Sequence, residues 1–171
     1  MKKKSTAYLA QAAVIAAVYA MLTYILQPLS FAGGQLRISE ALTILPVLTP
    51  AAVPALAIGC FISNIASPFG VIDMVLGTAA TLIAAFLSRA VRNIRFKGFP
   101  FLSAVFPVIF NALAVGTSIA VMNSGGFAWG VFAMNALSVA LSEAVVCFAA
   151  GLPLFRVLEK TKIFSDKEMK Q

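Results

Sequence analysis

Four ionisable side chains interrupt the apolar stretches of this sequence: Arg37, Glu40, Asp73 and Glu143. A charge at the centre of a membrane helix costs roughly 2.5–3.5 kcal/mol, so such residues usually face a cavity or a partner. A carboxylate accepts hydrogen bonds from two adjacent N–H groups at once. These side chains therefore predict a site for a small polar ligand, unless they pair with one another for structural reasons.

Glu143 is the first candidate because it is expected about 24 Å along its helix, far from compensation by either helix end. Asn135 and Ser138 precede it on a shared polar face, and Asn111 lies in the middle of the preceding helix. The alternative is an interhelical hydrogen-bond cluster that joins the last two helices without a ligand.

The other charged candidates are expected at the outer ends of helices, near water. Arg37 and Glu40 have the spacing of a same-face pair, and Ser39 can cap the helix that they begin. Asp73 can complement the positive end of a helix, and Asn64 is close enough in sequence to hydrogen-bond to it. A structural role and a place at the mouth of a ligand site both remain open for these residues.

Residues on which many enzymes rely are missing from the sequence. It contains no histidine, which excludes His-based zinc sites, Ser-His-Asp triads and Cys-His pairs. It contains no P-loop, so the chain does not hydrolyse ATP by that route. Cys60 and Cys147 lie in apolar segments without metal-site spacing and are expected to be small buried side chains. We therefore expect no catalytic residue, no metal site and no cofactor in this chain.

The composition indicates that these residues lie in a membrane protein. Of the 171 residues, 61% are hydrophobic and 11% are charged, whereas a soluble domain is roughly 45–50% apolar and about 25% charged. In lipid, the backbone must satisfy its own hydrogen bonds, which favours helices. The net charge of +7 does not indicate nucleic acid binding, because the basic residues lie between and beyond the apolar stretches.

The basic residues also predict the topology. All of them except Arg37 fall in three clusters, within residues 2–4, 89–97 and 156–170, and the positive-inside rule places all three in the cytoplasm. The stretch between the first two clusters is long enough for four membrane crossings, and the stretch between the second and third clusters is long enough for two. We predict an all-α integral membrane protein of six helices with both termini in the cytoplasm, made of one transmembrane domain (1–160) and a charged tail (161–171). The expected helices are 7–26, 37–48, 55–65, 71–90, 100–122 and 127–158.

A stripe of alanines runs along the first expected helix. Ala12, Ala16 and Ala20 repeat every fourth residue, with Ala13 and Ala17 beside them. Small residues at this spacing let another helix approach closely. That helix belongs either to the same chain or to a different membrane protein.

Five stretches of the sequence resemble motifs of the QueT family, the substrate-binding S components of energy-coupling factor (ECF) transporters assigned to queuosine precursors. The resemblance extends over about residues 7–159, and the first and third stretches are the most specific. They are Leu36–Pro46, Gly59–Asn64, Asp73–Leu82, Phe110–Gly116 and Ser142–Val146.

The resemblance implies a multi-pass protein of the cell membrane with the six-helix S-component fold. Such a protein binds a small molecule at its outer face and is not an enzyme. A transmembrane scaffold protein and two cytoplasmic ATPases are its expected partners, and the ATPases hydrolyse the ATP. The stripe of Ala12, Ala16 and Ala20 is then the expected docking surface for the scaffold.

A deazaguanine suits the polar residues of this chain. Its guanine edge presents an N–H and an amino group side by side, which a carboxylate accepts together, and in an aminomethyl precursor a second acid can pair with the side-chain cation. Another flat heterocyclic vitamin, an ion-coupled carrier or proton channel using Glu143 and Asp73, and a structural subunit without a ligand are the alternatives. The expected ligand-binding residues are Glu143, Asn111, Asn135, Asp73, Asn64, Glu40 and Arg37.

Overall fold

The computed structural model describes residues 6–30, 36–124, 127–161 and 163–164. The regular elements within these ranges are all helical, which confirms the all-α prediction for this part of the chain. Residues 2–4 and most of the predicted tail lie outside the described residues. The elements are α1 (Thr6–Ile25), α2 (Gln27–Ser30), η1 (Ile38–Val47), α3 (Ala52–Asn64), α4 (Gly70–Ala90), α5 (Phe101–Ser124), α6 (Trp129–Val146), η2 (Cys147–Gly151) and α7 (Leu152–Thr161).

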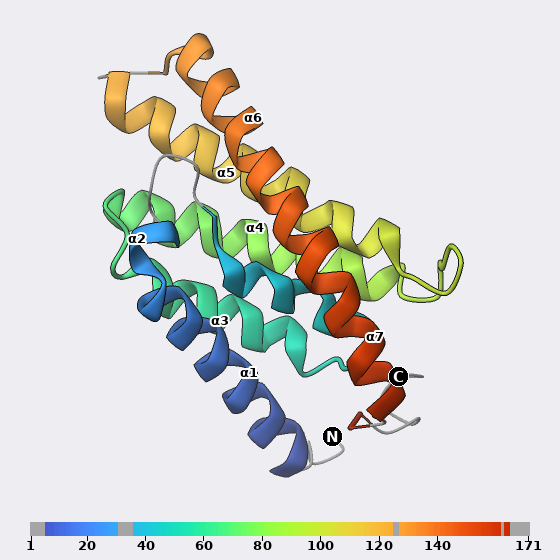
Figure 1. Cartoon of the computed structure of the whole chain (residues 1–171). Coiled ribbons are helices and arrows are strands. Elements are labelled where there is room, and N and C mark those ends of the chain that lie inside the picture. Colours follow the sequence, from blue (N-terminus) through green and yellow to red (C-terminus); the bar gives the residue numbers. More distant parts are fainter. Residues whose placement is uncertain (1–5, 31–35, 125–126, 162, 165–171) are drawn as a thin grey trace.

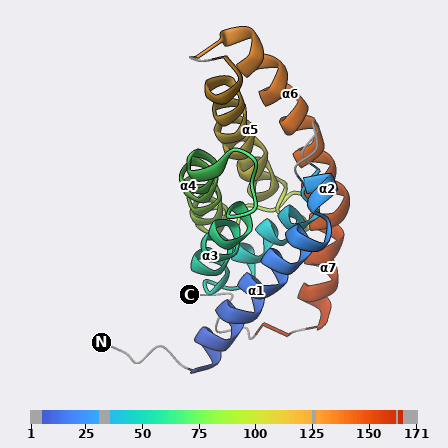
Figure 2. The same cartoon turned by 90° about the vertical axis from the view of Figure 1, so that its left-hand side faces the viewer.

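Four helical stretches are long and apolar enough to cross a membrane: Thr6–Ile25, Gly70–Ala90, Phe101–Met122 and Trp129–Thr161. At 1.5 Å per residue, even the 20-residue stretch is about 30 Å long, which matches the hydrocarbon core of a bilayer. Successive long stretches run in alternating directions, so α1 begins and α7 ends at the same end of the bundle (Figures 1 and 2). The apolar helices η1 and α3 are shorter.

The second predicted helix forms, but as a 3-10 helix in the middle of the bundle. This helix, η1, contacts α1, α3, α4, α5, α6 and α7, and most of its residues are buried. A 3-10 helix has three residues per turn, so side chains three positions apart line up along one edge. Glu40 and Thr43 therefore share an edge, with Arg37 one turn earlier at the N-cap. The expectation that Arg37 and Glu40 lie near water is wrong, because their side chains are 4% and 0% exposed.

The long last helix predicted over 127–158 is confirmed as one helical stretch, Trp129–Thr161, with an irregularity in its middle. There, η2 is a π-helix between α6 and α7. In a regular α-helix the ring of Pro153 would clash with the carbonyl of Ala149, and a π turn relieves this clash. A Cβ at Gly151 would lie 3.3 Å from the carbonyl oxygen of Ala41, so glycine allows η1 to pack closely here.

The alanine stripe of α1 faces the inside of the molecule. Ala16 and Ala20 are 6% and 7% exposed, and Ala12 is half-buried against the core. A Cβ at Gly59 of α3 would lie 3.0 Å from the carbonyl oxygen of Ala16, which shows how closely the two backbones approach. In this structure the stripe therefore packs within the chain, which was one of the two alternatives open from the sequence.

Candidate functional site

Six of the seven predicted ligand-binding residues are buried in the interior of the helix bundle. Their side chains are at most 4% exposed, although all of them are charged or carry an amide. Together with Tyr19 and Ser67 they form two groups, which we name the Asp73 group (Arg37, Asn64, Ser67 and Asp73) and the Glu40 group (Tyr19, Glu40, Asn111 and Glu143).

The Asp73 group is built around an ion pair. Arg37 Nη2 lies 3.2 Å from Asp73 Oδ2, and the Ser67 hydroxyl donates to the same oxygen at 2.7 Å. Asn64 Nδ2 donates to the backbone oxygen of Asp73 at 3.0 Å. The predicted bond between Asn64 and Asp73 is thus confirmed, but it uses the main chain of Asp73. Arg37, which was predicted to pair with Glu40, forms its ion pair with Asp73 instead. It lies at the N-cap with an extended backbone, outside the regular turns of η1 that position Glu40.

The Glu40 group brings together two carboxylates from distant parts of the sequence. Asn111 Nδ2 donates to Glu143 Oε1 at 3.2 Å, which is the contact between the last two long helices that the structural alternative predicts. The Tyr19 hydroxyl donates to Glu40 Oε1. Asn111 also interacts with Glu40, and the carboxylates of Glu40 and Glu143 interact electrostatically. Glu143 is therefore not an isolated acid but one of a pair.

Local hydrogen bonds of η1 differ from the expected helix cap. Ser39 Oγ lies 2.8 Å from Thr23 Oγ1 on α1, and the residue at the N-cap is Arg37, which makes no side-chain cap bond. The prediction that Ser39 caps this helix is wrong, because a 3-10 helix in the core directs Ser39 towards α1. Thr43 Oγ1 donates to the backbone oxygen of Glu40 at 2.6 Å and so helps to hold that residue.

Asn135 is not brought to the other candidates. Its side chain is half-buried, and its Nδ2 donates to the backbone oxygen of Val131, one turn earlier in α6, at 2.8 Å. Ser142 Oγ likewise donates to the backbone oxygens of Ser138 and Val139, so these side chains of the predicted polar face form hydrogen bonds within α6. Helical periodicity places these residues on a common face. It does not show that their side chains hydrogen-bond to backbone oxygens of the same helix.

Three buried oxygen atoms in the two groups have no hydrogen-bond partner among the described residues: Glu40 Oε2, Asn64 Oδ1 and Asp73 Oδ1. Buried polar atoms are nearly always hydrogen-bonded, and leaving one unpaired costs about 1–3 kcal/mol. All three atoms are acceptors. The groups are therefore suited to a ligand that brings several N–H donors into the interior of the bundle.

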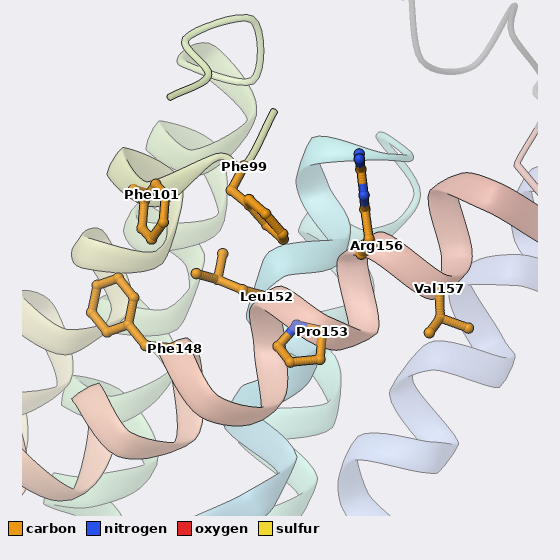
Figure 3. Close-up of a pocket in the computed structure, with 7 residues that line it drawn as sticks. All are labelled: Phe99, Phe101, Phe148, Leu152, Pro153, Arg156 and Val157. Atoms are coloured by element: carbon orange, nitrogen blue, oxygen red, sulfur yellow. The ribbon is translucent and has the colours of Figure 1, made fainter. Parts of the chain in front are cut away.

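A separate cavity of about 520 Å³ lies against the last helix, and we do not assign the ligand to it. Figure 3 shows its lining, which is apolar apart from Arg156. Arg156 Nη1 already bonds to Glu159 at 3.1 Å and its guanidinium lies 5.5 Å from the ring centroid of Phe99. No residue of the Asp73 or Glu40 group lines this cavity. The lining residues are Phe99, Phe101, Phe148, Leu152, Pro153, Arg156 and Val157.

Comparison with known proteins identifies the family. A family model described as "QueT transporter" matches residues 9–160, which is most of the chain. The chain belongs to the QueT transporter family. It is 37% identical over 93 residues to "Queuosine precursor transporter QueT" of Lactococcus lactis subsp. cremoris (strain MG1363). The matched stretch covers 53% of each chain, so the chain spans about half the length of this curated relative. No solved structure matches the chain.

Membership of the QueT family and the four long apolar stretches make this a multi-pass protein of the cell membrane. The polar groups of this QueT-family chain are then buried inside a membrane protein, where each unpaired acceptor is costly.

Sequence reasoning missed two members of the groups, Tyr19 and Ser67. Tyr19 is 0% exposed in α1, and Ser67 donates to Asp73 from the turn before α4. A tyrosine in an apolar helix is commonly an interfacial residue, so its type alone does not indicate a buried partner. Ser67 carried a weak signal, since it precedes a predicted helix in the manner of a capping residue.

Proposed function

We propose that this QueT-family protein is a substrate-binding S component that holds a queuosine precursor, a deazaguanine, between its Asp73 and Glu40 groups. The three unpaired buried acceptors carry this proposal. A deazaguanine offers a ring N–H and an exocyclic amino group side by side, together with a second ring N–H. Asn111 is the amide that we expect to hold the two carboxylates in position for the ligand, since it interacts with both Glu40 and Glu143.

Binding by the purified protein tests this function. We expect titration calorimetry in detergent, with no ion gradient, to show one molecule of a cyano- or aminomethyl-deazaguanine bound per protein. Adenine is the control, because its base-pairing edge presents an acceptor where guanine presents the ring N–H.

Two other results would replace the proposal. If neither deazaguanine binds and mass spectrometry finds another flat heterocycle retained by the protein, the chain is an S component for that compound. If binding occurs only with an ion gradient across proteoliposomes, the protein is an ion-coupled carrier that uses the Glu40–Glu143 pair.

We infer that transport by this protein is energised by other subunits, a transmembrane scaffold protein and two cytoplasmic ATPases, and that no cofactor is bound by this chain. The absence of a P-loop from the sequence supports this division. The docking surface that we propose is the outward face of α1, where Ala13 and Ala17 are exposed and Val14 is 62% exposed. This revises the expectation for Ala12, Ala16 and Ala20, since the latter two are buried within the chain.

We propose that η1 and α3 complete six crossings and that both termini are cytoplasmic. The alternating long helices and the basic residues at 89–97 and 156–160 support this orientation. An impermeant thiol reagent applied to intact cells should label a Trp129→Cys variant and not an Ile94→Cys variant; both side chains are exposed, and both native cysteines are buried. Labelling of only the Ile94 variant would reverse the orientation.

A further inference from the structure

The two groups of the candidate site differ in their charge. In the Asp73 group the carboxylate of Asp73 is paired with the guanidinium of Arg37 at 3.2 Å, so the group is close to neutral. The Glu40 group holds the carboxylates of Glu40 and Glu143. Within the described residues, its direct hydrogen-bond partners are neutral, namely Tyr19, Asn111 and the Cys147 thiol. Arg37, which forms its ion pair with Asp73, also interacts electrostatically with both glutamates.

The unpaired acceptors are distributed over both groups. Glu40 Oε2 is the unpaired atom of the group with two carboxylates, and its side chain is 0% exposed. Asn64 Oδ1 and Asp73 Oδ1 belong to the other group. Both of those side chains lie around Gly77, where a Cβ would be 2.7 Å from Asn64 Nδ2 and 3.9 Å from Asp73 Oδ1. Two neighbouring acceptors are suited to two neighbouring N–H donors.

Two buried carboxylates are costly inside a membrane protein when the arginine that acts on them is already paired with Asp73. A ligand that supplies the cation removes this cost and also donates to Glu40 Oε2. Charge-assisted hydrogen bonds of this kind are roughly twice as strong as those between neutral groups. A nitrile in the same place offers neither a charge nor a donor, and its nitrogen is itself an acceptor that would face the carboxylates.

We propose that the Glu40 group binds a ligand ammonium while the Asp73 group binds the guanine edge, so that the protein selects an aminomethyl-deazaguanine over its cyano counterpart. This inference rests on the proposed function, since it divides one deazaguanine between the two groups. An alkylamine is protonated near pH 7, as a lysine side chain is. The two ends of such a ligand then match the two groups in charge as well as in hydrogen-bond donors.

Titration calorimetry at pH 7 with the full chain in detergent tests the assignment. We expect the wild-type protein to bind the aminomethyl compound roughly 10- to 100-fold more tightly than the cyano compound, the difference that one charged hydrogen bond makes. Glu40→Gln should remove most of that preference by weakening the aminomethyl compound alone. Gly77→Ala, which crowds Asn64 without changing any charge, should weaken both compounds by a similar factor.

Controls separate this inference from the proposed function. An N-acetylated aminomethyl compound is neutral and can be measured with the wild-type protein. We expect it to bind no more tightly than the cyano compound. Equal affinity of the wild-type protein for the charged and neutral compounds would overturn the inference and leave the proposed function intact. Equal losses for both compounds in Glu40→Gln would also overturn it. If no deazaguanine binds at all, the proposed function itself is wrong.

Discussion

Replacing Arg37 with alanine is expected to lower the free energy of unfolding by about 3–5 kcal/mol, the cost of breaking a buried ion pair from one side. Arg37 and Asp73 are 4% and 0% exposed and lie 3.2 Å apart. The variant would leave Asp73 charged, buried and supported only by neutral groups such as the Ser67 hydroxyl. Unfolding of the purified protein by denaturant in detergent, followed by circular dichroism, measures the effect.

A double replacement provides the control for the Arg37 variant. Replacing both members of a buried pair with apolar residues often costs little, because no charge remains to be desolvated. We expect Arg37→Leu combined with Asp73→Leu to recover much of the stability lost in Arg37→Ala. Unchanged stability of the single variant would contradict the burial of this pair in the bundle.

Replacing Ala17 with leucine is expected to reduce uptake by cells more than tenfold while leaving ligand affinity and stability unchanged. Ala17 is exposed on α1, so a larger side chain is tolerated within the chain itself. Close approach of a scaffold helix, however, requires small residues at the contact. Uptake of labelled ligand by cells measures transport, and co-purification of the scaffold with the variant measures docking.

Two alanine variants control for added bulk. Ala133→Leu makes the same change at an exposed position of α6 and should not affect uptake if docking uses α1. Ala16→Leu makes the same change at the neighbour of Ala17, on the buried face of α1 that packs against Gly59. It should destabilise the protein by about 1–3 kcal/mol through overpacking. Normal uptake and assembly in Ala17→Leu would exclude this face of α1 as the docking surface.

The class of the protein, its helical content and the residues able to carry chemistry were determined by the sequence itself. Hydrophobicity and the placement of basic residues are properties of short stretches, so they predict apolar helices whatever the tertiary packing. The contact between Asn111 and Glu143 was predictable in the same way, because both lie deep in consecutive helices. Five stretches also carried the resemblance to the family whose model matches residues 9–160.

Which polar groups meet was decided only by the tertiary structure. Arg37 is 36 residues from Asp73 and Tyr19 is 21 residues from Glu40, and helical periodicity relates only residues of the same helix. The apolar pattern of the segment around Glu40 predicts a helix without showing its type. The segment forms a 3-10 helix enclosed by α1 and the elements from α3 to α7, which removes Glu40 from water and sets it beside Glu143. The adjacent alanine stripes of α1 have the same spacing, so only the packing of α3 and η1 against one side of α1 determines that Ala16 is buried and Ala17 is exposed.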